Sequence, residues 1–339
     1  MIVRDDYYDR VDMAVYREVV RPLLSEKILD FHVHVWRPTD EVGQYPGIWE
    51  VGFGFGELLE TARLMFPEQE YHAVVFGRPT LEGDRADDLV VHGAREHSNL
   101  YPLYIPDMHA SEQQVRRTVR QGGFFGFKPY WNLVEGKSSQ DDVTIRDMLP
   151  QPYTRVADDW GLIIMLHIPG SGRLADPRNL SDIRWLSAQC PNAKIVIAHL
   201  GRSYCLWSIK GNLEEICDLP NVYFGVSFVQ EAIVYKVLFD HVDPAKILYG
   251  SDLPLSRLRG RRVCMNGQWV DVTREPWAWA AHRDDAHPIE ATFMTYEMIR
   301  ALREGAEAAG LSSDEIEPIF YENGMRLIED TRRALESLA

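Results

Sequence analysis

The sequence has few of the features that assign a protein to a class at first sight. No apolar run among its 339 residues approaches the length of a transmembrane helix. The opening segment, MIVRDDYYDR, is charged and lacks the continuous apolar stretch of a secretory signal. We therefore expect a cytoplasmic protein that does not engage membranes.

Cysteine and positive charge are also scarce. Four cysteines without any C-x-x-C pair predict reduced, mostly buried thiols rather than a disulfide framework. Lys and Arg number 36 against 51 Asp and Glu, which gives a formal net charge of -15 and a surface that repels nucleic acid. The same surface repels anionic substrates, so any anion-binding site must be locally cationic or hold a metal.

What the chain does have is a regular alternation of strand-like apolar runs and helical segments. Strands are predicted near residues 28–35, 73–76, 101–105, 123–128, 162–167, 194–199, 222–226 and 247–249. Eight strands that alternate with helices favour parallel pairing, and their number matches that of a closed barrel. The sequence thus predicts an α/β fold, a (β/α)8 TIM barrel, with residues 1–339 as a single domain.

Four further segments are expected around this barrel. Apolar residues recur every four positions from Val11 to Leu23 and predict an N-terminal helix. Residues 37–56 form a long loop after the first strand. Residues 256–287 form an insertion after the eighth strand, with a hairpin turn at Asn266-Gly267. A closing pair of helices is predicted over residues 290–309 and 313–328.

The first chemical signal lies at the end of the first predicted strand. His32 and His34 are two residues apart, so on a strand their side chains project to the same face. Because the chain has 11 histidines, a His-x-His pair arises by chance roughly 0.3 times per chain. The pair therefore gains weight only from the residues that end the other strands.

Three other predicted strands also end in an ionisable residue. His167, His199 and Asp252 close the apolar runs of the fifth, sixth and eighth strands. Such a group is costly at the end of a buried strand unless it has a partner, and parallel barrel strands converge at one mouth. A divalent cation there would satisfy all five side chains, and four imidazoles with one carboxylate suit Zn²⁺ or another borderline ion.

This arrangement of four histidines and one aspartate resembles the amidohydrolase superfamily. The closer likeness is to its amidohydrolase-related branch, which includes lactonases, hydratases and metal-dependent decarboxylases. The resemblance extends over residues 28–328 and includes the late stretch ENGMRL. It implies that the metal is held by the following residues: His32, His34, His167 and Asp252. It also implies that His199 is a weaker ligand or a contact to substrate and catalytic water.

The resemblance also bears on the number of metal ions. Binuclear members of the superfamily carry a metal-bridging carbamylated lysine at the end of the fourth strand, and Lys128 falls near that place. In this branch, however, the site is usually mononuclear and such a lysine usually meets the substrate. We therefore expect one divalent ion, Zn²⁺ with Mn²⁺ as the alternative, and an unmodified Lys128.

The implied activity is that of a metal-dependent hydrolase acting on a small ester, lactone or amide. Asp252 would act as the base and His199 would hold the carbonyl oxygen or steer the water. A non-oxidative decarboxylase of a small acid, aromatic acids included, is the alternative, because the same metal ligands serve both reactions. A non-catalytic α/β ligand-binding protein is a remote alternative, since it would need a Gly-rich turn where the chain has His-Val-His-Val-Trp.

Cationic residues close to the predicted strand ends are candidates for holding a substrate carboxylate. The candidate substrate-binding residues are Lys128, Arg78 and Arg202, each with a surface ion pair as the equal alternative. Arg173 has the same two interpretations, whereas the basic stretch 257–262 is expected to be a solvated or interface patch. The expected partner is a small molecule, with or without a carboxylate, and a homo-oligomer remains open.

Overall fold

The computed structural model describes residues 4–37, 52–78, 87–275, 280–281 and 286–338. Within them, eight parallel strands form one sheet in which every strand neighbours the next one in the sequence. The strands are β1 (Lys27–His34), β2 (Glu70–Phe76), β3 (Leu100–Tyr104), β4 (Gly126–Phe127), β5 (Ile163–Leu166), β6 (Lys194–Ile197), β7 (Val222–Gly225) and β8 (Ile247–Leu248). All eight predicted strands are confirmed.

The sheet closes on itself where the last strand meets the first. The His34 N–H donates to the Leu253 carbonyl oxygen and the Asp252 N–H donates to the His32 carbonyl oxygen, both at 2.9 Å. A parallel bridge also joins Val33 to Leu253. The predicted (β/α)8 TIM barrel is therefore the observed fold.

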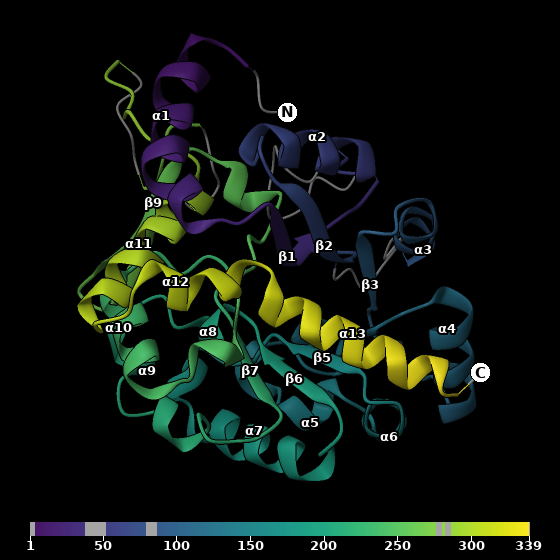
Figure 1. Cartoon of the computed structure of the whole chain (residues 1–339). Coiled ribbons are helices and arrows are strands. Elements are labelled where there is room, and N and C mark those ends of the chain that lie inside the picture. The colour runs from purple at the N-terminus through teal and green to yellow at the C-terminus, as the bar shows by residue number, and fades with distance from the viewer. Residues whose placement is uncertain (1–3, 38–51, 79–86, 276–279, 282–285, 339) are drawn as a thin grey trace.

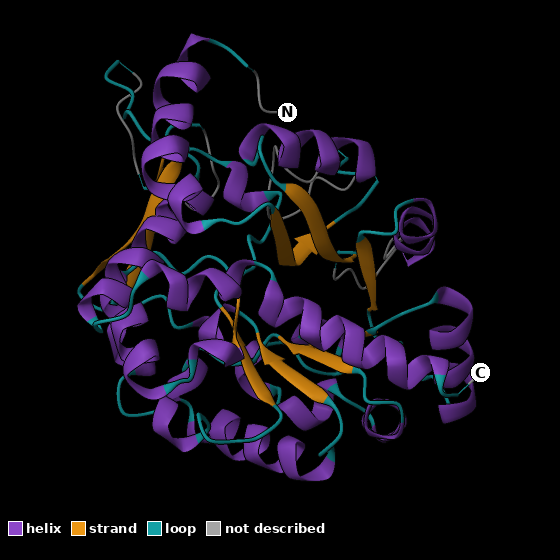
Figure 2. Ribbon diagram, viewed as in Figure 1, coloured by secondary structure: helices purple, strands orange, loops and turns teal. Residues whose placement is uncertain are grey.

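Helices surround the strands, as Figures 1 and 2 show. They are α1 (Met13–Val15), α2 (Phe55–Met65), α3 (Asp87–Glu96), α4 (Glu112–Gly122), α5 (Ile145–Met148), α6 (Gln151–Asp159), α7 (Pro177–Gln189), α8 (His199–Arg202), α9 (Leu206–Ile209), α10 (Ala232–His241), α11 (Met294–Ala308), α12 (Ser313–Ile316) and α13 (Glu322–Glu336). Local sequence sets their limits. In α4, the Ser111 side chain accepts from the Gln114 N–H in a capping box, and Gly123 ends the helix at a φ of 67°.

The apolar core has two layers, one between sheet and helices and one inside the barrel. The inner layer contains inward-facing residues of the strands, such as Phe31 and Met165, together with Met325, Leu327 and Ile328 of α13. In Figure 1, α13 crosses in front of the strands. The helix thus packs against the barrel interior from the end where the strands begin, which leaves the carboxyl ends of the strands for a functional site.

The segments around the barrel agree with the sequence in most respects. Continuous helical turns run from Tyr8 to Leu23. The hairpin consists of β9 (Gly260–Met265) and β10 (Gln268–Thr273), and Asn266 has a positive φ of 50° at its turn. The first closing helix begins at Met294, and the second is interrupted before α13, which continues to residue 336. Residues 38–51 of the predicted loop and residues 276–279 and 282–285 of the insertion lie outside the described residues.

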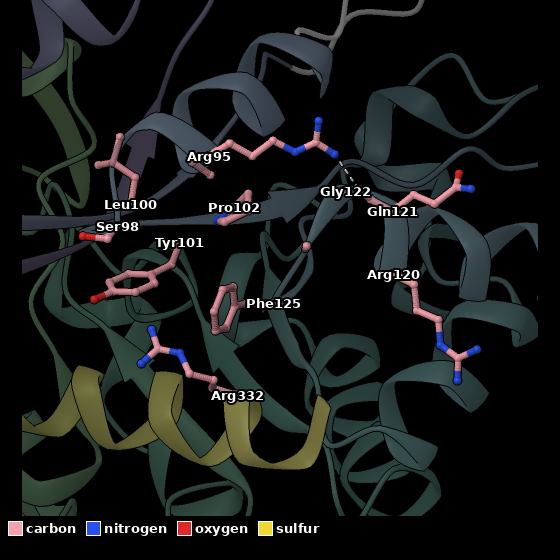
Figure 3. A pocket seen from close by; sticks show the side chains of 12 residues that line it. Arg95, Ser98, Leu100, Tyr101, Pro102, Arg120, Gln121, Gly122, Phe125 and Arg332 are labelled. Atoms are coloured by element: carbon pink, nitrogen blue, oxygen red, sulfur yellow. Dashed lines mark hydrogen bonds between the residues drawn. The ribbon is translucent and has the colours of Figure 1, made fainter. Parts of the chain in front are cut away.

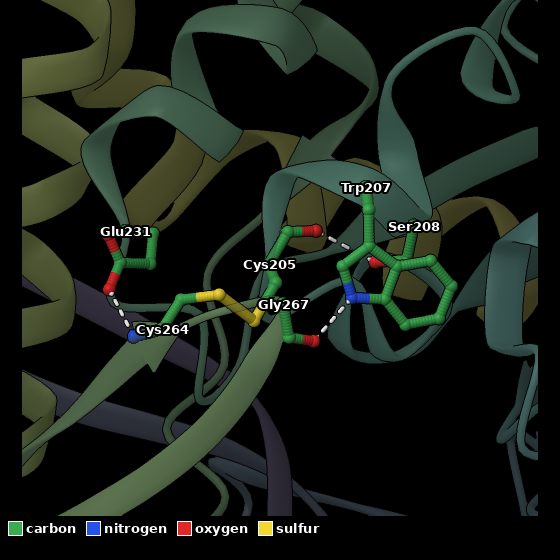
Figure 4. The surroundings of a disulfide bond; sticks show 6 residues. All are labelled: Cys205, Trp207, Ser208, Glu231, Cys264 and Gly267. Atoms are coloured by element: carbon green, nitrogen blue, oxygen red, sulfur yellow. Dashed lines mark hydrogen bonds between the residues drawn. A yellow bond between two sulfur atoms is a disulfide. The ribbon is translucent and has the colours of Figure 1, made fainter.

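The expectation of reduced thiols is wrong for two of the four cysteines. Cys205 and Cys264 form a disulfide across a sequence separation of 59 residues (Figure 4). Cys190 is a buried free thiol and Cys217 a half-buried one, as expected. The sequence did not predict this pairing, because the pairing depends on how the hairpin after β8 folds back over the segment that follows β6.

This disulfide should stabilise the fold, because a covalent link over 59 residues restricts the unfolded chain. The double variant Cys205→Ser/Cys264→Ser should lose about 4 kcal/mol of unfolding free energy, as measured by urea denaturation without reductant. Cys217→Ser is the control and should change stability little. A double variant as stable as the wild type would contradict the prediction.

A surface cavity of about 400 Å³ lies at the opposite end of the strands from the predicted site (Figure 3). Its lining includes Tyr101 at the start of β3, Phe125 before β4 and Arg332 of α13. The Arg332 guanidinium lies 5.8 Å from the centre of the Tyr101 ring and 5.9 Å from that of Phe125. In (β/α)8 barrels this face usually contributes to stability rather than to catalysis, so the cavity is not part of the candidate site.

Among the described residues, no helix has the length and apolar character required to traverse a bilayer.

Candidate metal centre

Three ionisable side chains converge where β1, β6 and β8 end. One ligand atom each from His32, His199 and Asp252 lies within 4.8 Å of the other two. All three residues are buried, with exposed fractions of 4%, 3% and 8%. The spacing and burial of these nitrogen and oxygen donors suit a divalent metal ion.

The Asp252 carboxylate is shared between the two histidines of β1. Its Oδ1 lies 3.3 Å from His32 Nε2 and 3.4 Å from His34 Nε2. Burial alone would raise the pKa of Asp252, but the contact with His34 and the electrostatic influence of the neighbouring basic side chains outweigh it and lower that pKa. The carboxylate therefore stays ionised at neutral pH.

Hydrogen bonds to the far ring nitrogens orient two of the imidazoles. His34 Nδ1 lies 3.0 Å from the Gly77 carbonyl oxygen, and His199 Nδ1 lies 3.0 Å from the Ser227 carbonyl oxygen. Because a carbonyl only accepts, both Nδ1 atoms must carry the proton, which leaves Nε2 with a free lone pair. Ser227 Oγ also approaches His199 Nδ1 at 2.9 Å and His32 Nδ1 at 3.4 Å.

Burial keeps the imidazoles neutral. It lowers the pKa of His199 to about 4, partly offset by the Asp252 charge, and lowers the pKa values of His32 and His167 well below the ordinary range. A neutral imidazole is the form that binds metal, so these side chains are ready to act as ligands at neutral pH.

His167 lies next to the three-residue cluster rather than within it. Its ring centre is 5.3 Å from that of His199 and 5.9 Å from that of Tyr130. His167 Nδ1 is buried and has no hydrogen-bond partner among the described residues. A buried polar atom without a partner is costly, so a ligand that approaches this nitrogen fits the site. The donor set suits Zn²⁺ and Mn²⁺ alike.

Unusual backbone conformations gather at the same mouth of the barrel. Within the described part of the chain, seven non-glycine residues have positive φ, and one of these is Asn266 in the hairpin turn. The other six follow the ends of β5 to β8: Arg173, His199, Leu200, Arg202, Phe228 and Asp252. Such left-handed conformations cost about 1–3 kcal/mol each and persist where surrounding structure enforces them. Their concentration here is typical of a functional site.

A profile of the amidohydrolase family matches residues 29–328. This chain is an amidohydrolase family member. The match covers both strand ends that carry His32 and Asp252, and it confirms the resemblance seen in the sequence. No curated protein matches the chain at a significant level.

Solved structures of similar fold include hydrolases and decarboxylases. A probable 2-pyrone-4,6-dicarboxylic acid hydrolase from Acinetobacter baumannii, with citric acid bound, has a TM-score of 0.55 and 14% identity over 89% of this chain and 98% of its own. A 5-carboxyvanillate decarboxylase from Sphingomonas paucimobilis has a TM-score of 0.53 and 12% identity over 89% of this chain and 99% of its own.

A third similar structure contains a metal. It is a dihydroxybenzoic acid decarboxylase from Polaromonas sp. JS666 with bound manganese and 2-nitroresorcinol. Its TM-score is 0.55, and its 13% identity extends over 90% of this chain and 97% of that one. At these identities the similarity establishes a shared fold and does not define the reaction.

The three predicted substrate-binding cations of this amidohydrolase have different surroundings. Lys128 is fully buried rather than at the surface. Its Nζ lies 4.8 Å from the centre of the Tyr130 ring and 5.3 Å from that of Phe76, with no hydrogen-bond partner among the described residues. Burial lowers the pKa of Lys128 to about 7, against the opposing effect of Asp252.

The two arginines lie in loops at the same mouth. Arg202 is half-buried, and its Nη1 donates to Gln140 Oε1 at 2.8 Å and to the Gly170 carbonyl oxygen at 3.0 Å. This nitrogen therefore ties the loop after β6 to the loop after β5. Arg78 is half-buried directly after Gly77, whose carbonyl oxygen contacts His34.

Sequence reasoning missed two buried charged residues near the candidate metal centre. Asp30 is buried and accepts from the Ser251 N–H at 2.7 Å and the Tyr71 hydroxyl at 2.9 Å, and burial raises its pKa to about 6. Strand periodicity could not have indicated this residue, because the register of β1 shifts between Asp30 and Val33. The second, Arg262, is 5% exposed and paired with Asp271, so the expectation of a solvated basic patch is wrong for this residue.

Proposed function

We propose that this amidohydrolase is a metal-dependent hydrolase that cleaves a small ester, lactone or amide. The supporting observation is the Asp252 carboxylate, which is held ionised and in contact with His32 and His34 at the barrel mouth. An ionised carboxylate beside imidazole nitrogens is equipped both to bind a cation and to accept a proton.

The metal would be held by residues of four strand ends. The proposed ligands are His32, His34, His167 and Asp252, with His199 as a further ligand or a contact to substrate and water. When bound, a divalent ion lowers the pKa of a coordinated water and polarises the substrate carbonyl. We propose one ion per chain, Zn²⁺ or Mn²⁺, and an unmodified Lys128.

The chain's own residues would move the proton and orient the substrate. Asp252 accepts a proton from the attacking water and passes it to the leaving group, because its lowered pKa keeps it ionised at neutral pH. His199, with Nδ1 fixed on Ser227, presents Nε2 to the carbonyl oxygen or the water. Lys128 offers a buried ammonium to a substrate carboxylate.

Decarboxylation of a small acid is the second candidate function. The buried Lys128, whose charge is influenced by that of Asp252, favours it, because Lys128 could hold a carboxylate while Asp252 delivers a proton to the carbon that loses carbon dioxide. Two of the similar solved structures are decarboxylases. Both reactions use Asp252 as the proton carrier, so mutating it does not separate them.

A balance of protons and carbon dioxide separates the two candidates. Metal-loaded protein is incubated at pH 7 with 2-pyrone-4,6-dicarboxylate, simple lactones and esters, 5-carboxyvanillate and dihydroxybenzoates. Hydrolysis of a lactone or ester releases one proton per turnover and no carbon dioxide. Decarboxylation yields carbon dioxide in the purged headspace and takes up a proton. Carbon dioxide without acid release would overturn the hydrolase proposal in favour of the second candidate.

A further inference from the structure

Arg173, in the loop that follows β5, is a cation whose buried nitrogens have no acceptor in the described structure. Its Nε and Nη1 atoms are shielded from solvent, and neither has a hydrogen-bond partner among the described residues. Buried N–H groups are almost always paired, and an unpaired one on a charged group is especially costly. The position therefore requires an acceptor from outside the described chain.

Aromatic rings hold the guanidinium without using its N–H groups. The Arg173 guanidinium carbon lies 5.7 Å from the centre of the Tyr204 ring and 5.7 Å from that of the Trp207 ring. Planar stacking on aromatic faces is a common way to fix an arginine while its N–H groups stay available. The two rings thus serve as a platform for the cation.

The disulfide fixes this platform. Cys205, directly after Tyr204, is linked to Cys264 of the hairpin, and the Trp207 indole N–H donates to the Gly267 carbonyl oxygen at 2.7 Å (Figure 4). Both rings are therefore attached to the hairpin that follows β8. A cation held on such a support is preorganised for a ligand.

Positive charge is in excess around this position. The nearby Arg262 is balanced by Asp271, with two hydrogen bonds of 2.7 and 2.9 Å, whereas Arg202 donates to the neutral Gln140. Burial, and then the charge of Arg202, lower the pKa of Arg173, although an arginine stays protonated at neutral pH. An anion there would relieve the repulsion and supply an acceptor for an unpaired N–H group.

The position is one aromatic ring away from the candidate metal centre. The centre of the Tyr204 ring lies 6.2 Å from that of His199 and 5.8 Å from that of Trp269. The Arg262 guanidinium carbon lies 4.5 Å from the centre of the Tyr204 ring and 4.5 Å from that of the buried Phe228 ring. Apolar rings between the metal centre and the cation suit a planar ligand that spans the two.

We propose that Arg173 anchors a carboxylate of the substrate that is distant from the reacting bond. The guanidinium fork matches the two oxygens of a carboxylate, which can accept from Nε and Nη2 on one edge of the group. The substrate class is accordingly a planar cyclic ester or lactone that carries a free carboxylate. This inference rests on the proposed function, because it assigns the anchored acid to the substrate of that site.

The test compares two inert acids that differ by one carboxylate. Metal-loaded wild type and Arg173→Gln are titrated calorimetrically with benzoate and with isophthalate (benzene-1,3-dicarboxylate). The wild type should bind isophthalate more tightly than benzoate, and Arg173→Gln should bind isophthalate roughly tenfold more weakly or worse, losing that preference. The melting temperature of Arg173→Gln without ligand should not fall, since the change removes a buried unpaired charge.

Arg332→Gln provides the matched control. Arg332 also stacks on two aromatic rings but lies at the other end of the barrel, so its variant should bind both acids as the wild type does. Wild-type preference for isophthalate in Arg173→Gln would overturn the inference, as would a wild type that binds neither acid or both equally. Since neither acid is hydrolysed, failure of the proposed reaction would appear only in the turnover assay and is distinguishable.

Discussion

Asp252→Asn is expected to lower turnover by roughly 10²-fold or more while most of the metal stays bound. Asparagine keeps the shape and one oxygen acceptor of aspartate, but it cannot take up a proton at neutral pH. The contacts of Asp252 Oδ1 with His32 and His34 indicate that the side chain has both a structural and a chemical role. Turnover on whichever substrate the wild type accepts, together with metal content, measures the two roles separately.

The pH dependence gives a second reading of the same variant. In the wild type, activity should fall as the pH drops through the lowered pKa of Asp252, because the protonated acid no longer accepts a proton. That acidic limb should be absent from the residual activity of Asp252→Asn. Asp240→Asn, at an exposed ion pair with Lys236, is the control and should behave as the wild type. Near-normal turnover with retained metal would show that Asp252 is not the base, and His199 would then be the first candidate for that role.

His32→Ala should abolish tight metal binding and activity together. The wild type should carry about one divalent ion per chain, measured by elemental analysis after extensive washing. His32 belongs to the cluster with His199 and Asp252, and removing its imidazole leaves too few donors in position to hold the ion. Metal content in the variant should therefore fall close to the background of the buffer.

His72→Ala separates the loss of a ligand from the loss of any buried histidine. His72 lies on β2, where Nε2 contacts Glu70 at 2.9 Å and Nδ1 contacts the Tyr101 hydroxyl at 3.1 Å. Its removal should lower stability and leave metal content unchanged. Full metal occupancy in His32→Ala, or two tightly bound ions per wild-type chain, would refute the mononuclear site.

The barrel was predictable because its strands are short apolar runs with clear ends. The apolar run before His167 forms β5, and the apolar run before Asp252 contains β8. Parallel topology then follows from the helical segments between strands, since right-handed crossovers leave few alternatives. Strand limits were less predictable: residues 123–128 were expected to form a strand, and only Gly126–Phe127 do.

The convergence of His32, His199 and Asp252 at one mouth of the barrel was predictable, but the contacts of these residues were not. Strand ends identified His32 and His199, whereas their shared neighbour Ser227 comes from a loop with no distinctive pattern. The disulfide of Cys264 and the burial of Arg262 depend on how the hairpin packs over the mouth, which no local periodicity encodes. Such long-range contacts are properties of the folded chain and not of any short segment.

The closure of the barrel between its first and last strands has a consequence for biosynthesis. His32 leaves the ribosome early, whereas Asp252, which donates its backbone N–H to the His32 carbonyl, follows 220 residues later. At a typical synthesis rate of about 5–20 residues per second, the two halves of the centre are apart for roughly 10 to 40 seconds. A nascent chain arrested before β8 would thus hold its histidines without the carboxylate that completes the proposed donor set, so we expect metal uptake only after β8 has joined the barrel.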